Sequence, residues 1–181
     1  MELQARASLL TYHRGMLSDV DRVDRYREAI MAVVREGDVV VDIGTGTGLL
    51  SYFACQAGAR RVFAIEAGDI VHVARELARA NGYDDRVEFI TAYSTEAVLP
   101  ERADVMITET LWNFGVGEGM IGFIEDARRR LLKPGARQVP QGVDLYAAPL
   151  QAGDFHERLV GWPHDRHGLS FSRATKICVT R

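Results

Sequence analysis

The chain has 181 residues, of which 47% are hydrophobic and 26% charged, with a formal net charge of −3; these values are typical of one globular domain. Its apolar runs are strand-sized, which excludes a transmembrane helix, and residues 1–6 lack the features of a signal peptide. Basic and acidic residues are interspersed, and Arg128-Arg129-Arg130 would spread over different faces of a helix, so nucleic acid is not favoured as a partner.

Helical and strand-like segments alternate along the chain. Two helices are expected first, at residues 2–12 and 18–35, with Ser18 or Asp19 capping the second. Then we expect strand 38–43, helix 47–57, strand 61–66, helix 69–80, strands 87–91 and 103–108, helix 118–132 broken by Lys133-Pro134-Gly135, strand 143–148, and a strand-like run at 174–180. This order predicts an α/β fold with a mostly parallel sheet and helices on both faces.

The two cysteines, Cys55 and Cys178, lie far apart and lack the spacing of a metal site. We therefore expect no disulfide, no bound metal, and a reducing, cytoplasmic compartment.

The most informative segment is the predicted strand Val39–Ile43 and the turn that follows it. Asp42 stands near the end of the strand, and Gly44, Gly46 and Gly48 alternate before a helical pattern begins. A strand that turns sharply into a helix directs backbone N–H groups into a crevice at the carboxyl end of the sheet. Because glycines let a ligand approach the backbone closely, the segment predicts a Rossmann-like site for a nucleotide-type cofactor.

The glycine spacing indicates which cofactor. A dinucleotide fingerprint requires Gly-x-Gly-x-x-Gly, whereas Gly48 comes one position early and Leu49 follows it. Asp-x-Gly-x-Gly-x-Gly instead resembles the first motif of class I S-adenosylmethionine-dependent methyltransferases. Asp42 suits the ammonium of that cofactor, directly or through water, and would repel a pyrophosphate. Glu66, 18 residues past Gly48 at the end of a predicted strand, is placed to accept hydrogen bonds from the ribose hydroxyls.

Several further segments point to one family. They are Tyr12–Asp19 with Arg22 and Tyr26-Arg27, Val62–Glu66, Thr108–Trp112 with Glu118-Gly119-Met120, and Leu131–Gly135. On these segments the chain resembles the catalytic half of protein arginine N-methyltransferases from about Tyr12 to Arg181. The resemblance implies a class I methyltransferase fold, S-adenosylmethionine as cofactor and S-adenosylhomocysteine as product.

The resemblance also assigns candidate site residues. Glu109 and Glu118 keep the family's interval of nine positions and would clamp a guanidinium. Arg22 would hold the carboxylate of the cofactor, and His13 and Met16 would line the methyl site. The other expected cofactor contacts are Met120 and, where the family places an acid near the adenine, Ser94 and Thr95.

The glutamate pair has a physical rationale of its own. A guanidinium is planar and permanently charged, and it pairs with carboxylates in bidentate fashion. Methyl transfer from a sulfonium is an in-line displacement, so positioning matters more than acid–base work. Two carboxylates can aim one nitrogen at the methyl group and hold the positive charge on the other nitrogens.

Some features of the family are missing. No Thr-His-Trp occurs, residues 1–10 contain no aromatic side chain, and Asn113 and Gly117 stand where the family has tyrosines. The sequence also stops before most of the family's β-barrel could form. Two explanations stay open: the catalytic half of a longer protein, or a minimal enzyme with a more open acceptor site.

We expect three parts: residues 1–36 as helices over the cofactor, 37–149 as the cofactor-binding domain, and 150–181 as an extension that is the start or remnant of a substrate-side barrel. Because a strand at the very end would leave an open edge, residues 150–181 are expected to pack on a second copy, as a homodimer, or back on the sheet. The leading function is methylation of an arginine or another guanidino or amino group, in a protein or a small molecule. The alternatives are a small-molecule N- or O-methyltransferase and a non-catalytic S-adenosylmethionine-binding module.

Overall fold

The structure is a computed structural model that describes residues 2–111, 119–149, 151–162 and 165–179. The chain divides into two compact units, Met1–Leu145 and Tyr146–Arg181. Within the described ranges, no helix has both the length and the apolar character needed to cross a membrane.

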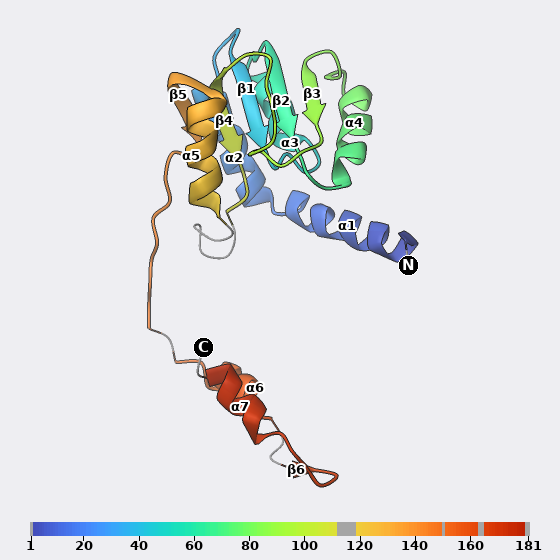
Figure 1. Cartoon of the computed structure of the whole chain (residues 1–181), viewed down its shortest axis with the longest axis vertical. Coiled ribbons are helices and arrows are strands. Elements are labelled where there is room, and N and C mark those ends of the chain that lie inside the picture. The colour runs from blue at the N-terminus through green and yellow to red at the C-terminus, as the bar shows by residue number, and fades with distance from the viewer. Residues whose placement is uncertain (1, 112–118, 150, 163–164, 180–181) are drawn as a thin grey trace. The chain divides into compact units, whose positions relative to one another are not determined.

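The first unit is built on a five-stranded parallel sheet with the strand order β3-β2-β1-β4-β5 (Figure 1). The strands are β1 (Val39–Ile43), β2 (Arg61–Ile65), β3 (Val87–Ile90), β4 (Ala103–Thr108) and β5 (Leu132–Val139). The helices are α1 (Glu2–Leu17), α2 (Val20–Val33), α3 (Leu49–Gln56), α4 (Ile70–Ala80) and α5 (Met120–Arg130). The predicted α/β, Rossmann-like fold is therefore confirmed.

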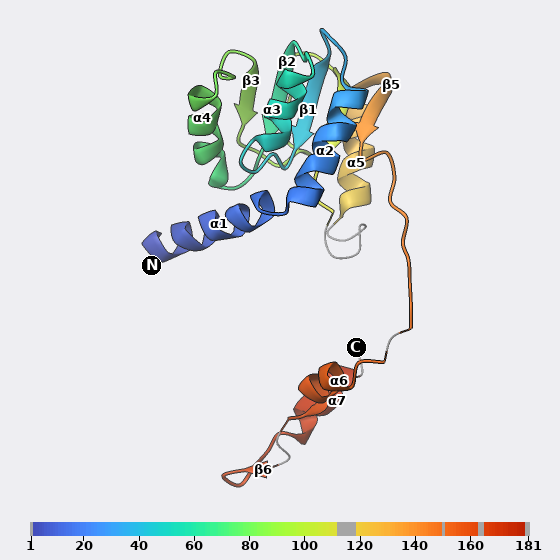
Figure 2. The ribbon, with the colours of Figure 1, turned by 180° about the vertical axis from the view of Figure 1, so that it is seen from behind.

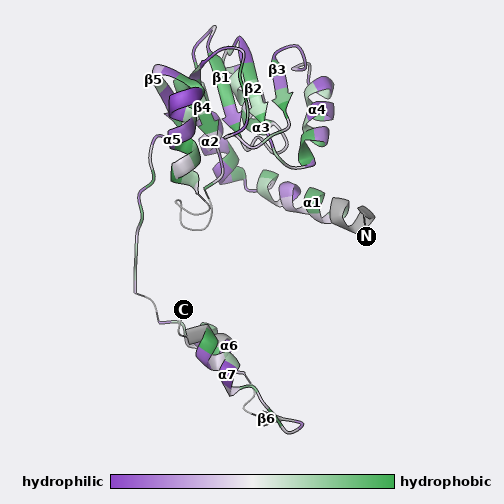
Figure 3. Cartoon of the chain, viewed as in Figure 1, coloured by the Kyte–Doolittle hydropathy of each residue, from purple (hydrophilic) through white to green (hydrophobic). Residues whose placement is uncertain are grey.

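Alternating residues of the central strands supply two apolar layers, one on each face of the sheet. Val40 and Val62 pack with side chains of α2 and α3 such as Ile30 and Phe53. On the opposite face, their neighbours in the strands pack with Ala127 of α5 and with Leu131, which follows that helix. Figure 1 shows α5 in front of the sheet, Figure 2 shows α2 in front of the other face, and Figure 3 shows apolar residues concentrated in the strands. Burial on both faces explains why these strands read as continuous apolar runs.

Both predicted N-terminal helices are present, with ends that differ from the expected ones. α1 extends to Leu17, five residues beyond the expected end. Of the two candidate caps for α2, Asp19 is the one used, because its carboxylate accepts a hydrogen bond from the backbone N–H of Arg22 at 3.3 Å.

The fifth strand was predicted at the wrong place. Residues 143–148 form no strand, and β5 instead runs through the Lys133-Pro134-Gly135 segment that was expected to be a break. β5 pairs with β4 on one side only, and the register shifts between the Ala103–Leu132 and Val105–Arg137 pairs. An edge strand with an irregular register accommodates a proline and a glycine with positive φ, since the ladder does not need every N–H there.

The second unit contains α6 (Gly153–Val160), a hairpin of β6 (Asp165–Arg166) and β7 (Leu169–Ser170), and α7 (Ser172–Val179). The prediction of a strand over residues 174–180 is wrong for its described part, because α7 occupies residues 174–179. Its β-branched residues form a helix that contacts α6, and the Thr175 hydroxyl donates a hydrogen bond to the carbonyl of Val160. Strand propensity depends on having a neighbouring strand, and the described residues supply none here.

Candidate functional site

A cavity of about 650 Å³ opens at the carboxyl ends of β1, β2 and β4, where they meet α1 and α2. From β1, the strands follow chain order through β2 to β3 toward one edge of the sheet, whereas β4 lies on the other side of β1. The cavity therefore lies where the strand order of the sheet reverses. The described residues that line it are Tyr12, His13, Met16, Leu17, Arg22, Val23, Tyr26, Gly44, Thr45, Gly46, Thr47, Leu49, Leu50, Glu66, Glu109, Thr110 and Leu111. The volume is within the range of small-molecule sites.

The turn between β1 and α3 forms one wall of the cavity. Gly44, Gly46 and Gly48 have φ values of +72°, +55° and +86°. A Cβ on Gly44 would lie 2.6 Å from Cγ2 of Thr110, and one on Gly48 would lie 2.4 Å from the hydroxyl of Tyr52. The first and third glycines are therefore required both by backbone conformation and by close packing.

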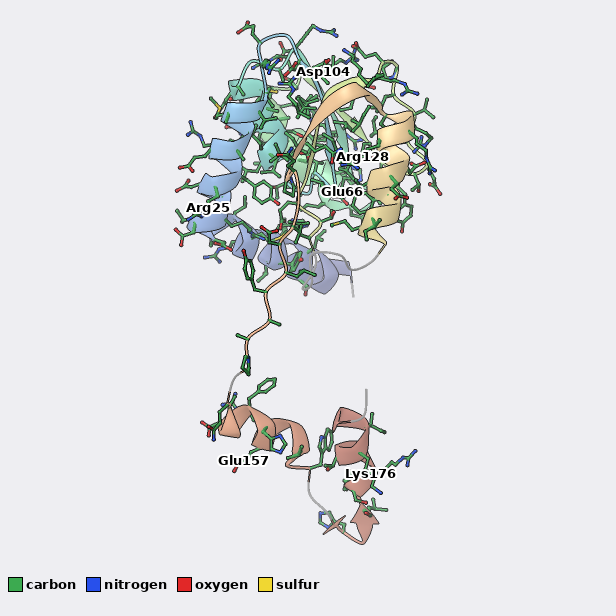
Figure 4. The ribbon with its side chains drawn as sticks, turned by 90° about the vertical axis from the view of Figure 1, so that its left-hand side faces the viewer. Arg25, Glu66, Asp104, Arg128, Glu157 and Lys176 are labelled. Carbon is green, nitrogen blue, oxygen red and sulfur yellow. The ribbon has the colours of Figure 1, made fainter. Side chains whose placement is uncertain are left out.

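Glu66 follows β2 and joins two backbone segments at the rim of the cavity. Its Oε2 accepts a hydrogen bond from the N–H of Gly46 at 3.0 Å, and its Oε1 accepts one from the N–H of Gly68 at 2.7 Å. Figure 4 labels Glu66 past the carboxyl end of β2 and Asp104 at the opposite, amino end of β4. Each carboxylate oxygen retains a further acceptor site, so Glu66 can also receive hydroxyl groups of a ligand.

Asp42 lies beneath the turn and does not line the cavity. It is fully buried, and its Oδ2 accepts hydrogen bonds from the hydroxyls of Thr45 and Ser51, each at 2.7 Å. Burial raises the pKa of Asp42 to about 6, although the two hydroxyls oppose this shift. Among the residues that the structure describes, none donates a hydrogen bond to its Oδ1. The expected influence of Asp42 on a ligand ammonium would therefore act through the turn or through water.

The end of α1 and the start of α2 cover the turn. A Cβ atom added to Gly46 would lie 3.2 Å from Cε1 of the His13 imidazole. The His13 ring therefore packs directly on the turn. Burial lowers the pKa of His13, although the nearby carboxylate of Glu66 opposes this shift. A neutral imidazole is the form that burial favours here.

Arg22 reaches the cavity from α2 and contacts two other predicted site residues. Its Nη1 donates to Oε1 of Glu109 at 3.3 Å, and its Nη2 donates to the backbone carbonyl of Met16 at 2.9 Å. Its Nε lies 3.4 Å from Oδ2 of Asp19. Arg22 is the one guanidinium among the described residues that line this cavity.

Glu109 follows β4 and is half-buried beside Arg22. Burial raises the pKa of Glu109, and the charge of Arg22 opposes that shift. Glu118 lies outside the described residues, so the predicted pairing of the two glutamates stays a prediction. Within the described part of the chain, no three His, Cys, Asp or Glu side chains form a group that could hold a metal ion.

Four other predicted site residues lie away from the cavity lining. Gly48 packs behind the turn against Tyr52, and Met120 is buried at the start of α5. Ser94 and Thr95 do not line the cavity, and the carbonyl of Ser94 accepts a hydrogen bond from Arg130 at 2.7 Å. The structure therefore brings together His13, Met16, Arg22, Gly44, Gly46, Glu66 and Glu109, but not these four.

Sequence reasoning missed several lining residues, of which Tyr26 is the most informative. The hydroxyl of Tyr26 lies 3.4 Å from the carbonyl of Thr108 at the end of β4, and burial raises its pKa. Tyr26 lies four residues after Arg22 on α2, so helical spacing would have placed both on one face.

Comparison with known proteins adds an independent finding. A family model described as Ribosomal protein L11 methyltransferase (PrmA) matches residues 27–143. A probable protein arginine N-methyltransferase 6 of Arabidopsis thaliana is 39% identical over 167 residues, which cover 91% of this chain and 38% of that protein. Protein arginine N-methyltransferase 6 of Danio rerio is 37% identical over 155 residues, 84% of this chain and 44% of that protein.

Solved structures resemble the chain in the same way. The Trypanosoma brucei PRMT1 enzyme-prozyme heterotetrameric complex with AdoHcy matches with a TM-score of 0.78 and 29% identity, over 92% of this chain and 53% of that chain. Arabidopsis thaliana protein arginine methyltransferase 10 matches with a TM-score of 0.72 and 30% identity, over 93% of this chain and 53% of that chain. The chain thus spans about half the length of these relatives or less.

Proposed function

This chain belongs to the methyltransferase family whose model matches residues 27–143, and on that premise we propose that it is an S-adenosylmethionine-dependent N-methyltransferase acting on an arginine guanidino group. One observation carries the proposal. The glycine turn after β1, Glu66 after β2 and Glu109 after β4 all open into one cavity. The similarity to protein arginine N-methyltransferases supports the choice of acceptor.

The donor groups of the cavity fit the proposed cofactor. Glu66 offers carboxylate oxygens to the ribose hydroxyls while it fixes the turn through Gly46 and Gly68. Arg22 offers a guanidinium to the carboxylate of the amino-acid tail. When bound, S-adenosylmethionine supplies a methyl group on a positively charged sulfur, which keeps the electron pair of the broken bond. The acceptor nitrogen forms the new bond and releases one proton to water.

Glu109 is proposed to orient the acceptor. It already receives a guanidinium N–H, that of Arg22, so a guanidinium has access to its carboxylate. Partial burial strengthens such a charge-assisted contact relative to the same contact in water. Together with Glu118, Glu109 would hold a planar guanidinium with one nitrogen toward the methyl group.

Transfer of a labelled methyl group tests this function. The chain is incubated with labelled S-adenosylmethionine and either an arginine-containing peptide or its lysine counterpart, and the modified residue is identified by mass spectrometry. Glu109→Gln should reduce transfer to arginine by about a hundredfold, because one oriented charge is lost. Glu101→Gln changes a partly exposed glutamate that pairs with Arg60, is the matched control, and should leave the rate unchanged. Transfer to lysine alone, or an active Glu109→Gln, would contradict the proposed acceptor.

We further propose that residues 1–36 close over the cofactor and that residues 150–181 pair with a second copy of the chain in a homodimer. Large apolar side chains in the second unit support that pairing, since Phe155 and Leu169 are exposed there. Light scattering would show a dimer, and deletion of residues 150–181 should convert it to a monomer. We also propose a reducing, cytoplasmic location, because the chain has only two cysteines, Cys55 and Cys178, far apart in the sequence.

A further inference from the structure

Two consecutive residues of α3 hold the glycine turn from the side opposite the cavity. The first is Ser51, which is fully buried. Its hydroxyl donates to Oδ2 of Asp42 at 2.7 Å, and the same oxygen accepts the hydroxyl of Thr45 at 2.7 Å. The Thr45 and Ser51 hydroxyls also lie 3.1 Å apart. One buried carboxylate oxygen therefore links β1, the turn and α3.

The second residue is Tyr52, whose hydroxyl lies under the other half of the turn. Its single proton is shared between the carbonyl of Thr47 at 3.0 Å and the carbonyl of Ala74 in α4 at 2.8 Å. The Tyr52 ring stacks on Tyr83, with 5.5 Å between the ring centroids, which fixes the direction of the hydroxyl. Gly48 leaves the space that the hydroxyl occupies.

The backbone alone does not fix the middle of the turn. The N–H groups of Gly44 and Thr45 donate to Ile65 at its start, and Gly48 donates back to Thr45 at its end. Between these points, Gly46 donates to the side chain of Glu66. Glycine-rich segments lose more entropy than others when they become ordered. A turn that is ordered before a ligand arrives avoids that loss at the moment of binding.

We propose that Ser51 and Tyr52 are positioning residues that keep this turn in its cofactor-binding shape, a role that rests on the proposed function. Neither residue lines the cavity. Their hydroxyls act through Thr45 and Thr47, and so keep the Gly46 N–H and Glu66 in register at the cavity rim. The sequence gives no hint of this role, because both positions lie within an otherwise apolar helix.

The test compares Ser51→Ala and Tyr52→Phe with the unaltered chain, using S-adenosylhomocysteine as the probe. Calorimetry should show a three- to tenfold larger Kd for each variant, about what the loss of one buried hydrogen bond would give. Hydrogen exchange of peptides spanning residues 40–50 should be faster, while kcat at saturating cofactor should stay close to normal. Tyr83→Phe is the matched control, since its hydroxyl contacts Gln56 and not the turn.

A further pair of variants separates positioning from general stability. Both Thr45→Ser and Thr45→Val alter the same cavity-lining side chain, but only Thr45→Ser keeps the hydroxyl that bonds Asp42, so the Kd of Thr45→Val should exceed that of Thr45→Ser by three- to tenfold. Variants that melt earlier but keep the original Kd and exchange rates would overturn the proposal. If the unaltered chain binds no S-adenosylhomocysteine, the proposed function fails instead, and the exchange comparison still decides whether these hydroxyls hold the turn.

Discussion

Replacing Asp42 with asparagine tests how strongly the surroundings of this buried carboxylate shift its pKa. Burial, with a smaller contribution from the charge of Glu66, raises its pKa from an ordinary 3.8 to about 6, while the hydrogen bonds from the Thr45 and Ser51 hydroxyls oppose the change. A raised native pKa means that the folded chain binds a proton more tightly than the unfolded chain. The stability that Asp42 contributes is thus present below about pH 4 and is lost as the pH rises through about 6. The full difference corresponds to about 3 kcal/mol.

Urea unfolding followed by circular dichroism, at several values between about pH 4 and pH 7.5, measures this loss. The free energy of unfolding of the unaltered chain, minus that of Asp42→Asn, should fall by up to about 3 kcal/mol across this window. Groups common to both proteins cancel in the difference. Asp104→Asn is the control: although burial acts to raise the pKa of Asp104, the hydrogen bond from Lys133 lowers it. Its contribution to stability is therefore lost only as the pH falls below about 4, and the difference for Asp104→Asn should stay level across this window. A difference for Asp42→Asn that does not change with pH would refute the reasoning.

Two further substitutions test the packing around the site. Gly44→Ala should lower the free energy of unfolding by about 1–3 kcal/mol more than Gly82→Ala does. Both glycines have a positive φ, but only a Cβ at position 44 would lie 2.6 Å from Thr110. Equal losses of free energy in urea unfolding would contradict the close contact. Arg137→Ala should destabilise the fold by about 2 kcal/mol, since its Nη2 lies 2.8 Å from both carboxylate oxygens of Asp38, yet it should leave the Kd for S-adenosylhomocysteine unchanged. An unaltered melting temperature would show that the ion pair does not anchor β5.

The centre of the sheet was predictable because local and tertiary requirements agree there. β1 and β2 are buried on both faces, so their sequences are continuous apolar runs. The turn after β1 needs positive φ values, so glycines mark its position. These two signals together located the cavity and Glu66.

The edge of the sheet and the second unit were not predictable in the same way. β5 pairs on one side only and contains Pro134 and Gly135, so its sequence looks like a loop. Residues 174–179 include strand-forming side chains but belong to α7, because contact with α6 decides their conformation. Long-range partners that no local pattern reveals determined both outcomes.

Within the site, sequence reasoning identified charged groups better than their surroundings. It indicated Glu66 by its place after a predicted strand, and Arg22 and Glu109 by the family resemblance, and all three line one cavity. It did not reveal that Asp42 is sealed beneath the turn, because burial of a carboxylate depends on the hydroxyls of Thr45 and Ser51 in three dimensions. It also gave no sign that Arg22 donates a hydrogen bond to Glu109, a contact between residues 87 positions apart.

Calorimetric titration with S-adenosylhomocysteine tests the central claim most directly. The unaltered chain should bind the compound at one site, and Glu66→Ala should bind it at least about tenfold more weakly, since hydrogen bonds to a charged carboxylate are lost. Glu88→Ala, on the neighbouring strand and paired with Arg61, should bind as the unaltered chain does. No binding by the unaltered chain, or equal affinity in Glu66→Ala, would contradict the account.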